Sequence, residues 1–145
     1  MLLKPETILR GLVGEIISRI ERRGLSIASL KMVSVTRRQA EELYTMHRGK
    51  PFYESLIEHI TSGPVVAMVV EGLDAIRVMR RMIGATNPCE AEPGTIRGDY
   101  GLTITKNVIH AADSLENAER EIKIFFKPEE IISTQRPAGA SCNKT

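Results

Sequence analysis

His110 is the residue of this chain whose position best suits covalent or acid–base chemistry. It follows the apolar pair Val108-Ile109 and precedes Asp113-Ser114, a pattern that predicts the end of a buried strand before a helix start. A histidine held there can act as a nucleophile or as a general base. Glu121, on the following predicted helix, would bond one ring nitrogen and leave the other free to attack. A structural role is the alternative for a lone histidine.

A second group of side chains that suit phosphate chemistry stands near the predicted ends of elements. Lys4 follows the first predicted strand, Arg80 lies near the end of a predicted helix, and Thr86 lies just beyond it. Arg97 and Lys106 belong to a long connection between elements. The arginine fork matches the oxygens of a phosphate group. Each residue alone is typical of a solvated surface. As a set, these residues make phosphate binding a comparable interpretation.

Aromatic side chains cluster in one short stretch of the chain. Tyr44, Phe52 and Tyr53 fall within ten residues, beside Arg48 and Lys50. Such a cluster can stack a nucleotide base. A local hydrophobic cluster under a loop is the alternative.

The common sequence motifs for phosphate and metal binding are absent. The chain has no GxxxxGK[ST] loop, no GxGxxG after a strand and no HExxH motif,. Cys89 and Cys142 are too few and too far apart for a zinc site or a disulfide framework,. His47 and His59 stand on polar faces of predicted helices, and we expect both on the surface. Nucleotide chemistry would have to use side chains dispersed through the fold.

Length and charge narrow the class of protein. The 145 residues suit one domain, and the net charge of +2 is too small to indicate nucleic acid or a membrane surface as partner,. The longest apolar run, Val65 to Val70, is far shorter than the roughly 20 residues of a membrane span,. No secretory signal precedes Lys4,. We expect a cytoplasmic protein without a membrane partner, and nucleic acid is not an expected partner either.

Hydrophobic periodicity predicts alternating strands and helices. The predicted strands are 1–3, 25–35 with a bulge near Ser29, 65–71 and 107–110, and the predicted helices are 12–23, 36–46, 52–61, 73–83 and 114–126. When one of the helical segments is treated as an insertion, the remaining order is βαββαβ. This order indicates an α+β, ferredoxin-like core, in which helices cover an antiparallel sheet. A doubly wound parallel sheet is the alternative. We assign residues 1–126 to the domain and expect 127–145 to be a divergent, mobile C-terminal tail.

Five segments in the same order along the chain resemble nucleoside diphosphate kinases. They are Arg10-Gly11-Leu12-Val13-Gly14-Glu15-Ile16-Ile17, His47-Arg48-Gly49-Lys50-Pro51-Phe52, Ile83-Gly84-Ala85-Thr86-Asn87-Pro88, Pro93-Gly94-Thr95-Ile96-Arg97-Gly98-Asp99 and Asn107-Val108-Ile109-His110-Ala111-Ala112-Asp113-Ser114. The resemblance covers about residues 2–126. It implies transfer of the γ-phosphate of a nucleoside triphosphate, such as ATP, to a nucleoside diphosphate, by a ping-pong mechanism with broad base tolerance.

The resemblance also implies roles for individual residues. It identifies His110 as the nucleophile that becomes phosphohistidine and Glu121 as its orienting partner, and Lys4 and Tyr44 match the residues that assist the transferred group. The other matches are phosphate ligands Arg80, Thr86 and Arg97, base-stacking Phe52 with its apolar neighbours Leu56 and Ile104, and sugar-binding Asn107. Mg²⁺ would arrive on the nucleotide phosphates, without protein metal ligands. The implied assembly is a homo-oligomer, expected to be a hexamer, with a tetramer as the alternative.

The chain departs from the family pattern at several places. Ala112 stands where the family usually has serine, and Glu6-Thr7 where it usually has Asp-Gly. The first predicted strand has only about three residues before Lys4, and the tail differs from the usual end. Ala112 is expected to slow catalysis through the loss of one hydrogen bond. The alternative function is that of a nucleotide-binding or assembly protein of the same fold, with weak or no turnover.

Overall fold

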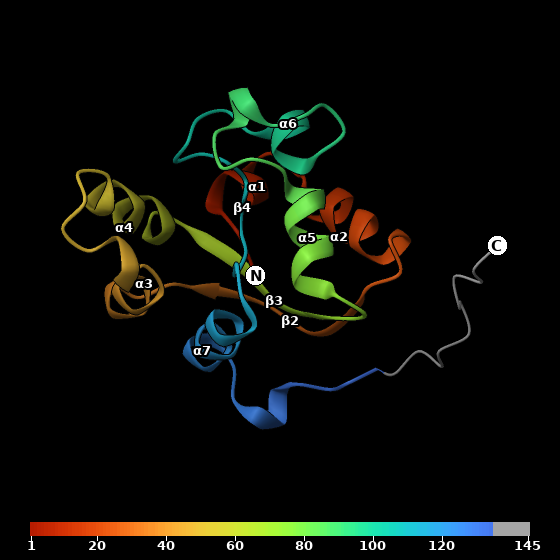
Figure 1. Cartoon of the computed structure of the whole chain (residues 1–145). Helices are drawn as coiled ribbons and strands as arrows, with labels where there is room; N and C mark the ends of the chain where they lie inside the picture. The colour runs from red at the N-terminus through yellow and green to blue at the C-terminus, as the bar shows by residue number, and fades with distance from the viewer. Residues whose placement is uncertain (135–145) are drawn as a thin grey trace.

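A four-stranded antiparallel sheet lies at the centre of the structure, in the order β2-β3-β1-β4 (Figure 1). This computed structural model describes residues 1–134. The strands are β1 (Leu2–Leu3), β2 (Ser26–Ser34), β3 (Pro64–Glu71) and β4 (Ile109–His110). The α-helices are α1 (Pro5–Leu9), α2 (Val13–Arg22), α3 (Arg37–Leu43), α4 (Tyr53–Thr61), α5 (Ala75–Ile83), α6 (Ile96–Tyr100) and α7 (Leu115–Phe125). Short 3₁₀ turns lie at η1 (Thr45–His47), η2 (Pro88–Glu90) and η3 (Pro128–Glu130).

Helices cover both faces of the sheet, and the apolar side chains of β3 point alternately to one face and the other. Val65 and Ala67 belong to a core cluster with residues of α3, α4 and α7. Val66 and Met68 belong to a second cluster with residues of α2, α5 and α6. A strand buried on both faces needs apolar residues at consecutive positions, which explains the unbroken apolar run in the sequence.

The pairing confirms the ferredoxin-like prediction and rejects the parallel alternative. β1 runs antiparallel to both of its neighbours, β3 and β4. The expected irregularity in β2 is also present, as a register shift between Ile27 and Ser29. Thr36 and Gln39 form the expected capping box at the start of α3, with the Thr36 hydroxyl oxygen accepting from the Gln39 amide at 3.2 Å.

The sequence analysis did not predict two short helices. α1 follows directly after Lys4, and α6 lies inside the stretch 85–106 that we expected to be a long connection. Each has only five residues, too few for a helical period to show in the sequence. Within residues 1–134, no helix has the length and apolar character to cross a membrane.

The first residues of the predicted tail pack against the sheet. The Ile132 amide donates to the Ala28 carbonyl of β2 at 2.8 Å, and the Lys31 ammonium group pairs with Glu130 at 2.9 Å. Ile131 contacts the core cluster on that face. The expectation of a mobile tail beginning at residue 127 therefore does not fit residues 127–134, and its remainder, 135–145, lies outside the described residues.

Candidate active site

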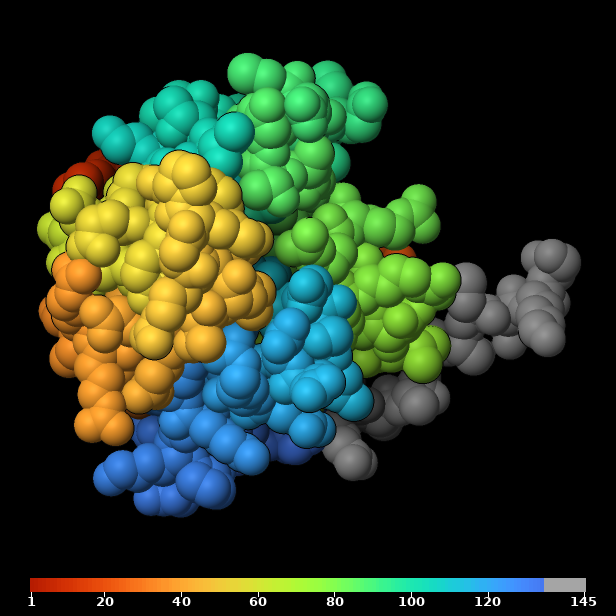
Figure 2. Space-filling view, turned by 60° about the vertical axis from the view of Figure 1, so that its left-hand side comes forward, coloured from red at the N-terminus to blue at the C-terminus, as the bar shows by residue number. Residues whose placement is uncertain are grey.

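One cavity of about 430 Å³ brings all of the predicted site residues together. Its lining includes Lys4, Tyr44, Phe52, Leu56, Arg80, Thr86, Arg97, Ile104, Asn107, His110 and Glu121. In Figure 2 the surface is hollowed between the η1–α4 segment (yellow), α5 (green) and the segment that leads into α7 (blue). A cavity of this size falls in the range of small-molecule sites. The roles of these residues stay predictions, although the fold places them side by side.

His110 is held at the floor of this cavity by a carboxylate. It is the last residue of β4 and pairs with Leu2 of β1. Its Nε2 lies 2.8 Å from Oε2 of Glu121, a buried residue of α7. This hydrogen bond favours the tautomer in which Nδ1 carries the lone pair. Burial lowers the pKa of His110 below its ordinary value, although Glu121 opposes the shift, so the ring is neutral and nucleophilic at pH 7.

Lys4 is a buried cation next to the same strand. Its ammonium group donates to Oδ1 of Asn107 at 2.6 Å and to the Thr105 carbonyl at 3.0 Å. Burial lowers the pKa of Lys4 to about 8, against the opposing effect of Glu6. The ring of Tyr44 lies edge-on to the His110 ring, with the ring centres 5.6 Å apart. Burial raises the pKa of Tyr44, so its hydroxyl keeps its proton and can donate it in a hydrogen bond.

Arg97 connects the cavity to the backbone around His110. Its Nη2 donates to the Ile109 carbonyl at 2.7 Å and its Nε to the Asn107 carbonyl at 3.3 Å. Burial and the charge of Arg80 lower the pKa of Arg97 to about 10, which leaves the guanidinium charged at pH 7. Asn107 in turn donates to the Thr86 carbonyl at 2.9 Å. These contacts leave two arginines and one lysine in one small space, an arrangement suited to a polyanion.

The opposite wall of the cavity is apolar and aromatic. Phe52 is 43% exposed, and Leu56 and Ile104 line the same cavity. His47 also lies here, with its ring centre 5.3 Å from that of Phe52. An exposed aromatic face beside a cationic region is suited to stacking a base. Tyr53 packs against the core instead.

Sequence reasoning placed two histidines incorrectly. His47, expected on the surface, lines the cavity with its neighbour Met46. His59, also expected on the surface, has a side chain that is only 13% exposed and lies 2.6 Å from Glu6. The helical pattern misleads for His59 because Glu6, the partner of its ring, comes from a distant segment. The aromatic neighbours of His47 are close to it in the sequence, at Tyr44 and Phe52.

Residues 1–134 contain no group of three or more His, Cys, Asp or Glu side chains arranged to hold a metal ion. The acidic residues that line the cavity are Glu121 and Asp113. Glu121 is already bonded to His110. A divalent cation in this site would therefore need ligands that the nucleotide phosphates can supply.

Comparison with known proteins points to one family. A family model described as nucleoside diphosphate kinase matches residues 1–131. A nucleoside diphosphate kinase of Staphylothermus marinus is 61% identical over 132 residues, which cover 91% of this chain and 94% of that protein. One of Archaeoglobus fulgidus is 55% identical over 136 residues, which cover 94% of this chain and 90% of that protein.

Solved structures agree with the sequence comparison. A halophilic nucleoside diphosphate kinase from Halobacterium salinarum, in complex with CDP, has a TM-score of 0.91 at 43% identity. The match covers 96% of this chain and 93% of that chain. The nucleoside diphosphate kinase of Encephalitozoon cuniculi, in its apo form, has a TM-score of 0.89 at 42% identity, covering 92% of this chain and 90% of that one.

Proposed function

The chain belongs to the nucleoside diphosphate kinase family, and we propose that it transfers the γ-phosphoryl group of a nucleoside triphosphate to a nucleoside diphosphate through a phosphohistidine at His110. The observation that carries this proposal is the 2.8 Å contact between Nε2 of His110 and Glu121. A histidine whose Nε2–H is donated to a carboxylate has its nucleophilic lone pair on Nδ1.

The reaction proceeds in two half-reactions, phosphorylation of His110 and transfer of the phosphoryl group to a second nucleotide. Nδ1 of His110 attacks the γ-phosphorus, a P–N bond forms, and the bond from the γ-phosphorus to the β–γ bridging oxygen breaks. The nucleoside diphosphate leaves with that bond's electron pair, and Glu121 stabilises the positive charge on the ring. A terminal phosphate oxygen of a second nucleoside diphosphate then attacks the phosphohistidine, and the P–N bond breaks. Free His110 is restored.

Charge neutralisation and positioning supply the rest of catalysis, as is general for phosphoryl transfer. Lys4, Arg80 and Arg97 supply positive charge on the phosphate side of the cavity. Asn107 is suited to the sugar and Phe52 to the base. Stacking does not read the edge of a base, so we propose broad base tolerance. Mg²⁺ would be bound by the nucleotide phosphates and would neutralise their charge.

The pH profile of kcat/KM is expected to fall on both sides of neutrality. As the pH rises through about 8, Lys4 loses its proton and phosphate binding loses one charge. As the pH falls below 6.5, His110 gains a proton, at a pKa that burial lowers, and loses its attacking lone pair. Initial rates of GTP formation from ATP and GDP measure the profile.

Lys4→Arg provides the control for this profile. Arginine keeps its charge well above pH 8, so the fall near pH 8 should disappear in Lys4→Arg and the acid fall should remain. An alkaline fall of unchanged midpoint in this variant would contradict the assignment to Lys4.

Ala112→Ser is expected to raise kcat by about 2- to 10-fold, the effect of one added hydrogen bond in the transition state. Ala112 lines the cavity beside Glu121, so a hydroxyl there can join the polar network around His110. Steady-state kinetics with ATP and GDP check the increase, and Ala91→Ser, outside the lining of the cavity, is the matched control. A decrease or no change in kcat would show that the missing hydroxyl does not limit this enzyme.

Initial-rate kinetics test the proposed function as a whole. A covalent intermediate predicts ping-pong behaviour: parallel lines when reciprocal rate is plotted against reciprocal ATP at several GDP concentrations. The alternative, a binding protein of the same fold with little turnover, predicts nucleotide binding by calorimetry without GTP formation. High identity to proteins named for the activity does not favour this alternative.

We propose that the chain works in the cytoplasm as a homo-oligomer, with a hexamer as the expected form. Leu30 and Met32, which are 48% and 61% exposed, lie on β2, an edge strand of the sheet. Exposed apolar side chains on a strand edge favour pairing with another copy. Light scattering on the full chain measures the subunit number.

A further inference from the structure

Val108, two residues before His110, has a backbone conformation that valine rarely adopts. Its φ of 75° lies in the left-handed region, and a β-branched residue there is a genuine outlier. Among residues 1–134, Asp74 is the one other non-glycine residue with positive φ. Val108 is fully buried. Such a conformation persists only when the surrounding contacts impose it, and it is typical of functional sites.

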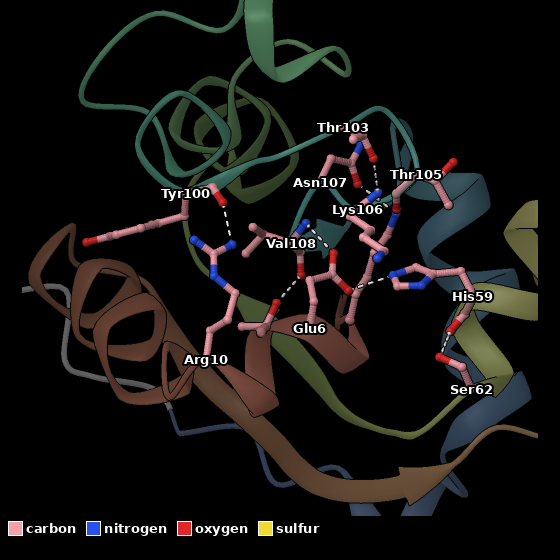
Figure 3. A network of polar contacts seen from close by, with 12 residues as sticks. Glu6, Arg10, His59, Ser62, Tyr100, Thr103, Thr105, Lys106, Asn107 and Val108 are labelled. Atoms are coloured by element: carbon pink, nitrogen blue, oxygen red, sulfur yellow. Dashed lines mark hydrogen bonds and ion pairs between the residues drawn. The ribbon is translucent and has the colours of Figure 1, made fainter.

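Residues 4–7 help to impose this conformation, beside the bond within the turn from the Ile109 amide to the Asn107 carbonyl at 2.8 Å. The Val108 amide donates to Oε1 of Glu6 at 2.9 Å. The Val108 carbonyl accepts from the Thr7 hydroxyl at 2.6 Å and from the Lys4 amide at 2.9 Å. Figure 3 shows Glu6 reaching the strained backbone from α1. Both backbone polar groups of Val108 are thus bound by one short segment more than a hundred positions earlier in the chain.

Glu6 is itself held by a second element. Its Oε2 lies 2.6 Å from Nε2 of His59 in α4 (Figure 3). Only 9% of the Glu6 side chain and 13% of the His59 side chain are exposed. Burial raises the pKa of Glu6, but the hydrogen bonds from His59 and from the Val108 amide outweigh burial and lower it. Glu6 is therefore a buried carboxylate with both oxygens engaged.

The turn at Val108 sits between the groups that do the proposed chemistry. Asn107 on one side holds the Lys4 ammonium group. The Ile109 carbonyl on the other side holds Arg97, and His110 follows. A change in the peptide orientation at Val108 would move all of these groups relative to one another. Catalytic geometry tolerates little such movement, since a misplacement of about 1 Å can cost about 10²-fold in rate.

We propose that Glu6, oriented by His59, is a positioning residue for His110, and that it acts by fixing the left-handed turn at Val108. This inference rests on the proposed phosphotransfer at His110. Glu6 does not line the cavity. Its charge raises the pKa of Lys4, against the larger effect of burial, and its hydrogen bond reaches the site through the backbone of residues 107–109. The Glu6-Thr7 pair, where the family pattern has Asp-Gly, thus has a role: carboxylate and hydroxyl bind the two sides of one peptide turn.

Two replacements of similar size separate hydrogen bonding from packing. Glu6→Gln keeps an oxygen that can accept from the Val108 amide, whereas Glu6→Met fills the same space without an acceptor. In single-turnover phosphorylation by saturating ATP, Glu6→Met is expected to be slower by about 10- to 100-fold, and Glu6→Gln to stay within about 3-fold of the wild type. Nucleotide affinity should change less than the rate. Glu58→Gln, on an exposed residue next to His59, is the matched control.

Amide hydrogen exchange supplies a readout that does not depend on activity. Protection of residues 107–110 should fall in Glu6→Met and be retained in Glu6→Gln. Thr7→Val and Thr7→Ser repeat the comparison on the carbonyl side of the turn, should Glu6→Met not fold. His59→Phe should show an intermediate loss of rate.

The outcomes distinguish this inference from the function on which it rests. If the wild type forms no phosphoenzyme, the proposed function fails, and hydrogen exchange alone decides whether Glu6 fixes the turn. If the wild type is phosphorylated and Glu6→Met reacts at the wild-type rate with unchanged protection, the positioning role is overturned. Equal losses in Glu6→Met and Glu6→Gln would also overturn it.

Discussion

Replacing His110 with alanine is expected to abolish phosphoryl exchange, with kcat lowered by at least about 10⁴-fold, as is typical for loss of a covalent nucleophile. The variant lacks the nitrogen that forms the P–N bond. Among the described residues, His110 is the one histidine of the cavity lining that is bonded to a buried carboxylate. Nucleotide binding should persist, because the cations and the aromatic wall remain. An assay of GTP formation checks the loss of turnover, and calorimetric titration with ADP checks that binding persists.

His47→Ala is the matched control for His110→Ala. Both histidines line the same cavity, but His47 lies against Phe52 on the aromatic wall. Its loss should raise KM for nucleotides and leave the phosphorylation step in place. Residual turnover in His110→Ala above about 1% of wild type, a level far above that expected without the nucleophile, would contradict the assignment.

The second large effect is expected for Arg97→Ala, which should lower kcat/KM by about 10²- to 10³-fold, the usual effect of losing one preorganised donor to a developing negative charge. The same change should destabilise the fold by about 2–4 kcal/mol, because one buried carbonyl loses its side-chain donor and a second keeps only the Ile109 amide as donor,. Those carbonyls belong to Asn107 and Ile109, on either side of the strained Val108. Kinetics and urea unfolding measure the two effects separately.

Arg97→Lys separates charge from hydrogen-bond geometry. A lysine keeps the positive charge but lacks the fork that spans two carbonyls. We expect Arg97→Lys to recover part of kcat/KM and little of the lost free energy of unfolding. Wild-type stability in both variants would mean that the contacts from Arg97 to the backbone do not support the segment before His110.

About half of the candidate site was predictable from short segments that are collinear with a known family, which contain Phe52, Thr86, Arg97, Asn107 and His110. Tyr44 and Phe52 are close in the sequence, but Arg97 and His110 come from distant segments, and local patterns alone do not bring them together. The sheet does so, because β1 pairs with β4 and places Leu2 opposite His110. The small number of strands and the length of the chain favoured the ferredoxin-like core, and the pairing of the strands decided against the parallel alternative.

The Glu6–His59 contact could not be predicted from local pattern. Glu6 lies in a five-residue helix that shows no periodicity, and His59 lies on a face of α4 that has a polar sequence. Each looks like a surface residue until the other is placed beside it. The positive φ of Val108 was likewise hidden, since left-handed backbone is expected at glycine or asparagine and not at valine.

Isolation of a phosphoenzyme tests the central claim most directly. The protein is incubated with ATP labelled in the γ-phosphate, freed of nucleotide, and then given unlabelled GDP. The claim predicts label on His110 that is stable to alkali and labile to acid, and its transfer to GTP when GDP is added. Absence of label on the intact protein, or label that persists in His110→Ala, would contradict it.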